Sequence, residues 1–273
     1  MFDTVIEMLS YPFMTRAFLV GSLVALCSAL LGVSLVLKRY SMIGDGLSHV
    51  GFGAMAIAAA MNAAPLTVAI PVVIVAAILL LRISGNAKIK GDAAIALIST
   101  TSLAVGVMVI SLTTGMNTDV YNYMFGSILA MSAEDVKLSL VLSVFVLILF
   151  IVFYHKIFAI TFDETFARAT GVKAGVYNTL IAVLTAVTIV LGMQMMGAML
   201  ISSLVIFPAL TSMRIWKSFK SVVISSGILA VICFCIGMIV SYQFSTPAGA
   251  SVVLVNLCAF AIFFVIQKIR EHI

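Results

Sequence analysis

The amino-acid sequence predicts an all-α, polytopic membrane protein with about nine transmembrane helices in one domain. Hydrophobic residues make up 63% of the 273 positions and charged residues only 9%. Apolar runs long enough to cross a bilayer recur from one end of the chain to the other. The longest polar interruptions, 114–137 and 155–173, are about twenty residues long and too short for a soluble domain. Residues 1–273 are therefore expected to form a single transmembrane domain, with any soluble machinery supplied by partners.

Nine apolar segments, each about twenty residues long, are candidate transmembrane helices. They are 17–37, 44–61, 65–82, 92–113, 138–154, 174–192, 197–213, 221–242 and 250–267. The first fifteen residues mix apolar and acidic side chains, and they either lie along the surface or add a crossing. Eight to ten spans is therefore the expected range.

The basic residues predict which way the chain is oriented. Connections on one side of this scheme hold 13 of the 15 Lys and Arg residues. These connections are 38–43, 82–92, 155–173, 214–220 and the tail from 268. Basic residues collect on the cytoplasmic side of membrane proteins, so this side, with the C-terminus, is predicted to be cytoplasmic.

Residues 119–135, on the predicted outer side, contain an apolar stretch that is too short to cross a bilayer. A crossing there would also reverse the charge assignment of every later connection. We therefore expect a short interfacial or re-entrant helix on the outer face. This side holds two basic residues against five acidic ones, a balance that would concentrate cations. The same balance also arises if acidic residues simply remain after basic ones are sorted inward.

One acidic residue, Asp45, lies inside an apolar segment, and His49 follows it by four positions. On a helix this spacing places the carboxylate and the imidazole on one face. An ionisable pair within a membrane helix is costly and usually has a function. Carboxylate and imidazole ligands suit zinc, manganese or ferrous iron, although two ligands alone are too few for a stable site. The pair is therefore a candidate metal site that water, a backbone carbonyl or a second subunit would complete.

A structural interpretation of the same pair also fits the sequence. Asp45 would cap a helix that begins just after Gly44, and His49 would donate a hydrogen bond to a neighbouring helix. Glycines at positions 44, 46, 51 and 53 remove side chains around the pair, which allows close helix packing or opens a path. These glycines favour the metal site modestly, because close packing alone gives the same pattern. Proton coupling through the pair also stays open.

The connection 155–173 contains a segment, 161–172, with the pattern of a short capped amphipathic helix. An acidic pair at 163–164 is followed by apolar residues at helical spacing and a closing glycine at 171. Such a helix either docks a cytoplasmic partner or lies on the lipid surface. Periodicity alone favours neither interpretation.

The predicted span 197–213 contains a proline at position 208. Pro208 should bend the helix and free a carbonyl group. The bend serves either a gate or a simple change of direction, and the sequence leaves both open.

Taken in order, several motifs of the chain resemble those of the ABC-3 family of bacterial metal permeases, the membrane subunits of zinc, manganese and iron ABC importers. The motifs are Leu37-Lys38-Arg39 to Asp45-Gly46-Leu47-Ser48-His49, Gly91-Asp92-Ala93-Ala94-Ile95, Phe125-Gly126-Ser127-Ile128-Leu129, Phe162-Asp163-Glu164 to Ala169-Thr170-Gly171, Met196-Gly197-Ala198-Met199-Leu200 to Pro208-Ala209, and Pro247-Ala248-Gly249. Each motif alone is weakly specific, but the ordered series covers nearly the whole chain.

The resemblance implies a fold related to the vitamin B12 and siderophore permeases, in the bacterial cytoplasmic membrane. It implies three kinds of partner, namely two cytoplasmic ATPase subunits, an external metal-binding protein and a second permease copy in a homodimer. It also implies that Asp45 and His49 are metal ligands on the translocation path and that the region 159–172 holds the coupling helix. The residues implied in coupling to the ATPase are Phe162, Asp163, Glu164, Phe166, Ala167, Arg168 and Gly171.

The chain contains no Gly-Lys-Ser or Gly-Lys-Thr phosphate loop, so ATP hydrolysis is expected in a partner. We therefore expect a permease subunit that carries a divalent transition metal as substrate, zinc first and manganese second, by alternating access. Nucleic acid is not an expected partner. The alternatives are a proton-coupled secondary transporter and an intramembrane metalloenzyme, although no His-Glu-x-x-His or Gly-x-Ser-x-Gly motif supports the enzyme.

Overall fold

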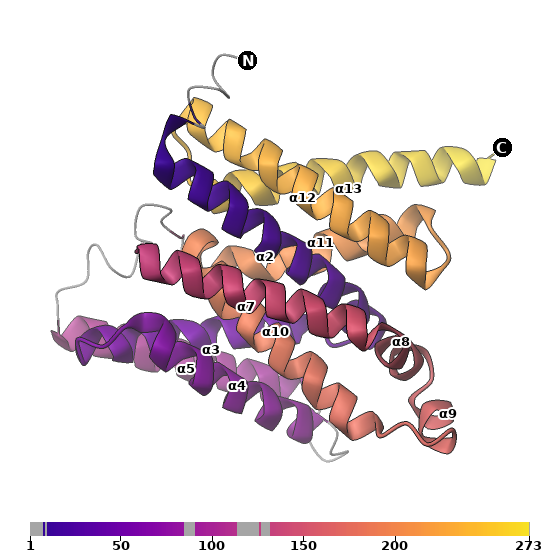
Figure 1. The fold of residues 1–273 in the computed structure, drawn as a ribbon, viewed down its shortest axis with the longest axis horizontal. Helices are drawn as coiled ribbons and strands as arrows, with labels where there is room; N and C mark the ends of the chain where they lie inside the picture. The colour runs from indigo at the N-terminus through magenta and orange to yellow at the C-terminus, as the bar shows by residue number, and fades with distance from the viewer. Residues whose placement is uncertain (1–7, 9, 85–90, 114–125, 127–131, 273) are drawn as a thin grey trace.

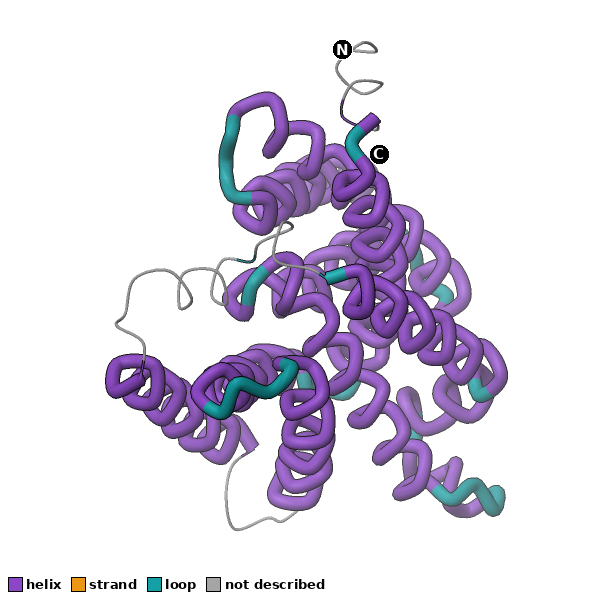
Figure 2. Tube along the Cα trace, turned by 60° about the vertical axis from the view of Figure 1, so that its left-hand side comes forward, coloured by secondary structure: helices purple, strands orange, loops and turns teal. Residues whose placement is uncertain are grey.

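The computed structural model describes residues 8, 10–84, 91–113, 126 and 132–272, which form eleven helices joined by turns (Figure 1). Figure 2 shows only helices and loops in these ranges. The helices are α2 (Pro12–Leu37), α3 (Ser41–Ala60), α4 (Pro65–Ser84), α5 (Gly91–Thr113), α7 (Ala133–Val152), α8 (Tyr154–Phe162), α9 (Glu164–Ala169), α10 (Ala174–Met196), α11 (Ala198–Ile215), α12 (Phe219–Phe244) and α13 (Ala248–His272).

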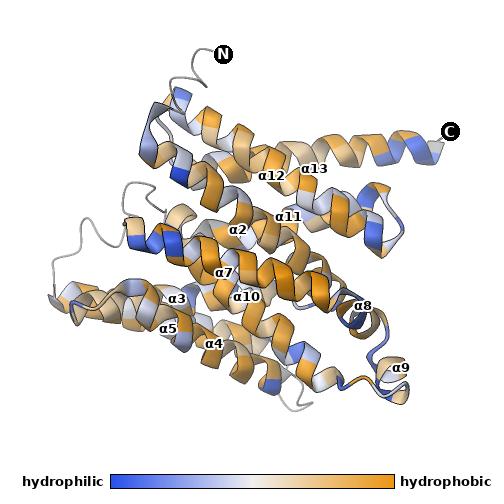
Figure 3. Cartoon of the chain, viewed as in Figure 1, coloured by the Kyte–Doolittle hydropathy of each residue, from blue (hydrophilic) through white to orange (hydrophobic). Residues whose placement is uncertain are grey.

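Each of the nine predicted spans corresponds to one of these helices, which confirms the all-helical membrane fold. Within the described residues, eight helices are long and apolar enough to cross a membrane, and α11 is a shorter apolar helix. Figure 3 shows polar residues at the start of α7 and at the C-terminal end of α13, with apolar residues between the helix ends. This distribution matches helices whose middles lie in hydrocarbon.

The start of α7 is fixed by its own sequence. The Ser132 hydroxyl accepts the backbone N–H of Asp135 at 3.1 Å, and the Asp135 carboxylate accepts the backbone N–H of Ser132, forming a capping box. Within the range 119–135, the structure describes Gly126 and residues 132–135. The expected outer-face helix therefore lies mainly outside the described residues, and residues 133–135 form the first turn of α7.

Close contacts show that α3 and α5 run in the same direction. A Cβ atom placed on Gly46 would lie 2.7 Å from the Cγ2 atom of Ile95, and one on Gly53 would lie 2.7 Å from the carbonyl oxygen of Ser102. Small residues allow membrane helices to approach this closely. The common direction agrees with the predicted spans, in which the second and the fourth both leave the predicted cytoplasmic side.

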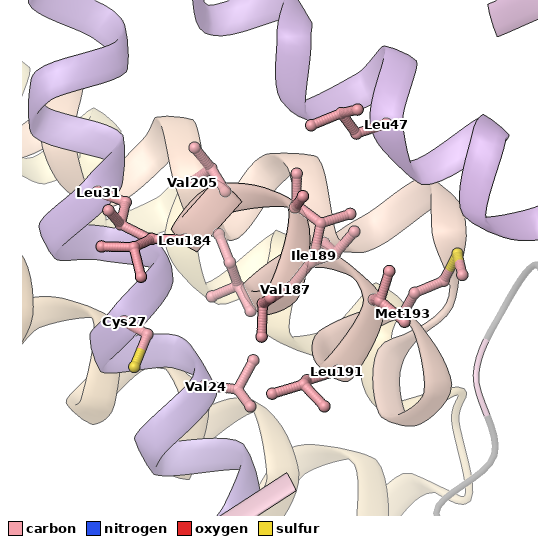
Figure 4. Close-up of a cluster of buried hydrophobic side chains, with 14 of the residues drawn as sticks. Val24, Cys27, Leu31, Leu47, Leu184, Val187, Ile189, Leu191, Met193 and Val205 are labelled. Atoms are coloured by element: carbon pink, nitrogen blue, oxygen red, sulfur yellow. The ribbon is translucent and has the colours of Figure 1, made fainter. Parts of the chain in front are cut away.

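Helices α2, α3 and α10 form the centre of the bundle. In the most apolar 18-residue stretch of each of these helices, 67% to 78% is buried, against 28% or less for α4, α5, α7 and α13. Figure 4 shows part of this core, with buried side chains contributed by α2, α3, α10 and α11. Because α3 is central, the pair at positions 45 and 49 is carried by a helix that packing holds firmly.

Candidate functional site

Asp45 and His49 lie within α3, as its fifth and ninth residues. The helix begins at Ser41, with Tyr40 in the N-cap position and no side-chain cap. Asp45 therefore does not cap the helix, and that interpretation is wrong because α3 begins one turn earlier than expected. An ionisable side chain in this position needs a different partner.

The two side chains face each other at a distance suited to sharing an ion. The His49 Nε2 atom lies 3.7 Å from the Asp45 Oδ2 atom, which is too long for a hydrogen bond. Two ligands of one tetrahedral metal, each about 2.1 Å from it, are roughly 3.4 Å apart. The His49 Nδ1 atom is buried and has no hydrogen-bond partner within the described part of the chain. The hydrogen bond to a neighbouring helix that the structural alternative expects is therefore not made through Nδ1.

One side of the pair is closed by neighbouring helices and the other is open. A Cβ on Gly46 or on Gly51 would lie 2.7 Å from a side chain of α5 or α10, respectively, so the back of α3 packs tightly. The Asp45 side chain is 40% exposed and that of His49 15% exposed. The pair therefore opens towards the surface of a single chain, although it lies within an apolar helix.

Asp45 and His49 together offer two ligands at this position. No group of three or more His, Cys, Asp or Glu side chains that could hold a metal occurs among the described residues. Stable sites for divalent transition metals have four or more ligands. The geometry therefore fits transient binding, or a site that other groups complete.

The region 159–172 contains a short capped helix, α9, which follows α8. Asp163 is the N-cap residue of α9, and its carboxylate accepts the backbone N–H of Phe166 at 2.8 Å. Gly171 follows the helix with a φ of 85°, a conformation that favours glycine. Phe162, which was expected in the same helix, belongs to α8. Phe162 and Phe166 are 59% and 65% exposed, so two aromatic side chains are available to a partner.

Glu164, the first residue of α9, belongs to a polar cluster that the sequence analysis missed. Lys38, at the end of α2, donates to the Glu164 carboxylate at 3.2 Å and to the Asn178 side-chain oxygen at 2.5 Å. The Asn178 amide donates to Glu164 at 3.0 Å, and Arg168 donates to its other oxygen at 2.6 Å. Three helices, α2, α9 and α10, thus meet at one carboxylate.

The surroundings of Glu164 keep its carboxylate ionised. Burial raises its pKa, but hydrogen bonds from Asn178, Arg168 and Lys38, with the Lys38 charge, outweigh burial and lower the pKa to about 2. Burial lowers the pKa of Lys38, and Glu164 opposes that shift. The Lys38 side chain is 10% exposed and that of Glu164 32% exposed, so this ion pair is partly desolvated.

The only sequence signal of this cluster is weak. Lys38 and Asn178 are polar residues near the ends of predicted spans, where polar residues are common. Neither has a spacing that points to position 164, because 126 and 14 residues separate the partners.

Pro208 lies inside α11, which runs through it from Ala198 to Ile215. A proline has no N–H to donate, so the carbonyl of Leu204 lacks its usual helical partner. The helix follows Gly197 directly, and the φ of 88° at this glycine makes a tight turn from α10. Pro208 therefore lies in a different helix from the pair on α3.

A bundle of nine apolar helices with a carboxylate and an imidazole inside a central one defines a multi-pass membrane transport protein. Comparison with protein families makes the assignment specific: residues 10–267 match the ABC 3 transport family, so the chain belongs to that family. It is a permease subunit of an ABC metal importer, and its task is transport rather than catalysis.

Relatives extend along nearly the whole chain. The manganese import system permease protein ScaB of Streptococcus gordonii is 29% identical over 95% of this chain and 94% of its own length. The structure of PsaBC from Streptococcus pneumoniae in complex with Fab matches with a TM-score of 0.86 and 29% identity, covering 96% of this chain and 94% of that one. A metal-chelate type ABC transporter in an inward-facing conformation has the same fold, with a TM-score of 0.73, 16% identity and coverage of 92% and 85%.

Proposed function

We propose that this chain is the permease of a bacterial importer of divalent transition metals, in which Asp45 and His49 bind the ion transiently on its path. The observation that carries the proposal is the open pair in α3, whose His49 Nδ1 is buried without a partner while Nε2 faces a carboxylate at 3.7 Å. Groups left this way in a membrane helix are costly unless a ligand uses them.

A second copy of the chain would complete the site. The Asp45 side chain is 40% exposed on an apolar helix, where lipid would be a poor neighbour for a carboxylate. In a two-fold symmetric homodimer, two such pairs near the axis would supply four ligands. The exposed side of α3 then faces the partner copy instead of lipid.

Manganese is the metal that we expect to be carried. A carboxylate and an imidazole accept either zinc or manganese, and the expectation that followed the family resemblance put zinc first. The relative ScaB is named as the permease of a manganese import system, which favours manganese over zinc for this chain. Thiolates are not part of the pair, which also suits a harder ion such as manganese.

Partners on both sides of the membrane would drive and feed the transport. The family implies an ATPase and a substrate-binding protein. We place two ATPase subunits on the predicted cytoplasmic side against the region 159–172, which presents the exposed rings of Phe162 and Phe166. The external protein would deliver the ion from the opposite face. Pro208 would serve as a bending point of α11 during alternating access.

This function is tested by reconstituting the complete transporter complex in liposomes. The purified chain, its ATPase and its binding protein should take up manganese, and zinc less rapidly, only when ATP is supplied to the ATPase side. Substituting Asp45→Ala or His49→Ala should reduce uptake by roughly 100-fold or more, because the described residues place no third ligand beside the pair to compensate. Assembly of the complex should be unchanged.

Ser48→Ala is the matched control. Ser48 lies between the two ligands on the same helix, and its hydroxyl donates only to the backbone carbonyl of Asp45, at 2.7 Å. Its removal should leave uptake within about twofold of wild type, because such local bonds contribute about 1 kcal/mol or less. Undiminished uptake in both ligand variants would exclude their role, and uptake without ATP would exclude the ABC mechanism.

A further inference from the structure

The cluster of Lys38, Glu164 and Asn178 lies between the two parts of the proposed transport mechanism, the coupling helix and the metal pair. Each of the three side chains bonds to the other two: Lys38 to Glu164 at 3.2 Å and to Asn178 at 2.5 Å, and Asn178 to Glu164 at 3.0 Å. A closed triangle of charged hydrogen bonds has a fixed geometry, since moving one member strains two bonds.

The coupling helix α9 has little else that fixes it to the bundle. Among its six residues only Ala167 is buried, and the large side chain of Phe166 is 65% exposed. Apolar burial of a single alanine gives a weak attachment. Glu164 therefore makes the polar part of the attachment, through Lys38 to α2 and through Asn178 to α10.

Lys38 is joined to the metal-binding helix by a short and well-bonded turn. It is the C-cap residue of α2, and only Arg39 and Tyr40 separate it from the first residue of α3. The Tyr40 N–H donates to the carbonyl of Leu35 at 2.8 Å, and Arg39 adopts a left-handed φ of 61°. From the start of α3, Asp45 is only about 6 Å further along the helix axis.

We propose that Lys38, Glu164 and Asn178 are positioning residues that make α9 move together with the ends of α2 and α10, so that displacement of α9 by the ATPase reaches α3 and its metal ligands. This inference rests on the proposed function, because it needs an ATPase that acts on α9. The three residues neither bind the metal nor contact ATP.

The cluster has a simpler alternative role, as a clamp that only stabilises the folded chain. Both roles predict lower stability when it is broken. The two roles differ in the number of metal ions transported per ATP hydrolysed. A clamp affects only the amount of assembled complex, whereas a mechanical link also affects how many ions are transported in each cycle of ATP hydrolysis. The ratio of uptake to hydrolysis is therefore the measurement that separates them.

The test uses the complete complex in liposomes, with manganese as the probe and with uptake and ATP hydrolysis measured in the same sample. The variants Lys38→Met and Glu164→Gln should still assemble with the ATPase and hydrolyse ATP. The number of ions transported per ATP should fall by about tenfold, the size expected when a coupling interaction is lost. Glu164→Gln preserves the shape of the side chain, so it gives a result even if Lys38→Met fails to assemble.

Lys173→Met is the matched control for Lys38→Met. Lys173 is an exposed lysine at the start of α10, and its ammonium group makes no hydrogen bond or ion pair with a described residue. Its ratio of ions to ATP should equal that of wild type. The double variant with Lys38→Glu and Glu164→Lys should recover part of the ratio, because it restores the ion pair with its charges reversed.

The outcomes are distinct. An unchanged ratio in Glu164→Gln would reject the inference and leave the cluster as a clamp. A normal ratio with fewer assembled complexes would do the same. Wild-type complexes that show no ATP-dependent uptake would instead reject the proposed function itself, before any variant is compared.

Discussion

The chain contains two clusters of polar side chains among apolar helices, and they are built in opposite ways. At the Glu164 cluster, Glu164 accepts three side-chain hydrogen bonds, and Lys38 and Asn178 bond to it and to each other. At the candidate metal pair, Asp45 and His49 lie 3.7 Å apart without a hydrogen bond, and the Nδ1 atom of His49 has no partner in the described structure. One cluster is saturated and the other is not.

This difference supports the roles that we propose for the two clusters. A saturated, partly buried cluster fixes the geometry of the helices that meet there, because any displacement breaks strong bonds. An unsaturated pair leaves coordination capacity for something that arrives and departs. A transport protein needs both properties, a weak site for the ion and a stiff connection to the source of energy.

The largest expected effect follows from replacing the unsatisfied imidazole. His49→Leu should reduce metal uptake by roughly 100-fold or more. It should leave thermal stability equal to or slightly above that of wild type, because it removes a buried polar atom that has no partner. The measurement is uptake in liposomes beside thermal unfolding of the same preparation. A clear loss of stability would show that His49 holds the fold, and the contrast between the two clusters would disappear.

Sequence alone predicted the helices well, because each one is set by a local property. The nine spans are apolar runs, and the basic connections between them give a direction to each. The pair at positions 45 and 49 was also visible, since the spacing of four residues is a local helical relation. Its structural alternative failed on a detail that local signals define poorly, the residue at which α3 begins.

The Glu164 cluster could not be predicted in the same way. Lys38 and Glu164 are 126 residues apart, and they meet only because α2, α9 and α10 pack together. No periodicity relates such positions. The segment around 163 and 171 was recognised as a capped helix from its own residues, but the attachment of Glu164 to two other helices is a property of the tertiary fold.

A smaller effect is expected from the glycines that let α3 pack closely against α5. A Cβ at Gly53 would lie 2.7 Å from the backbone oxygen of Ser102, so Gly53→Ala must separate α3 from α5 and should cost about 1–3 kcal/mol. Gly175 lies in α10, the helix that carries Asn178 of the Glu164 cluster, and a Cβ added there would have nothing within 4 Å. Gly175→Ala should therefore be neutral or stabilise by a few tenths of a kcal/mol. Thermal unfolding of both variants checks this, and equal destabilisation would show that packing at α3 is not the tighter of the two.

The smallest effect is expected from pH, and it tests whether the Glu164 carboxylate stays ionised in its cluster. The depressed pKa of Glu164 contributes stability that is complete above the ordinary carboxyl pKa of 4.5 and is lost as pH falls towards about 2. The difference in unfolding temperature between wild type and Glu164→Gln should therefore stay constant from about pH 8 to pH 5. Thermal unfolding of the two proteins at each pH provides the measurement. If the stability difference vanished between pH 8 and pH 5, the hydrogen bonds around Glu164 would not hold its carboxylate ionised, and the contrast with the open pair on α3 would be lost. A constant difference would show that the attachment of α9 to α2 and α10 keeps its charges over this range.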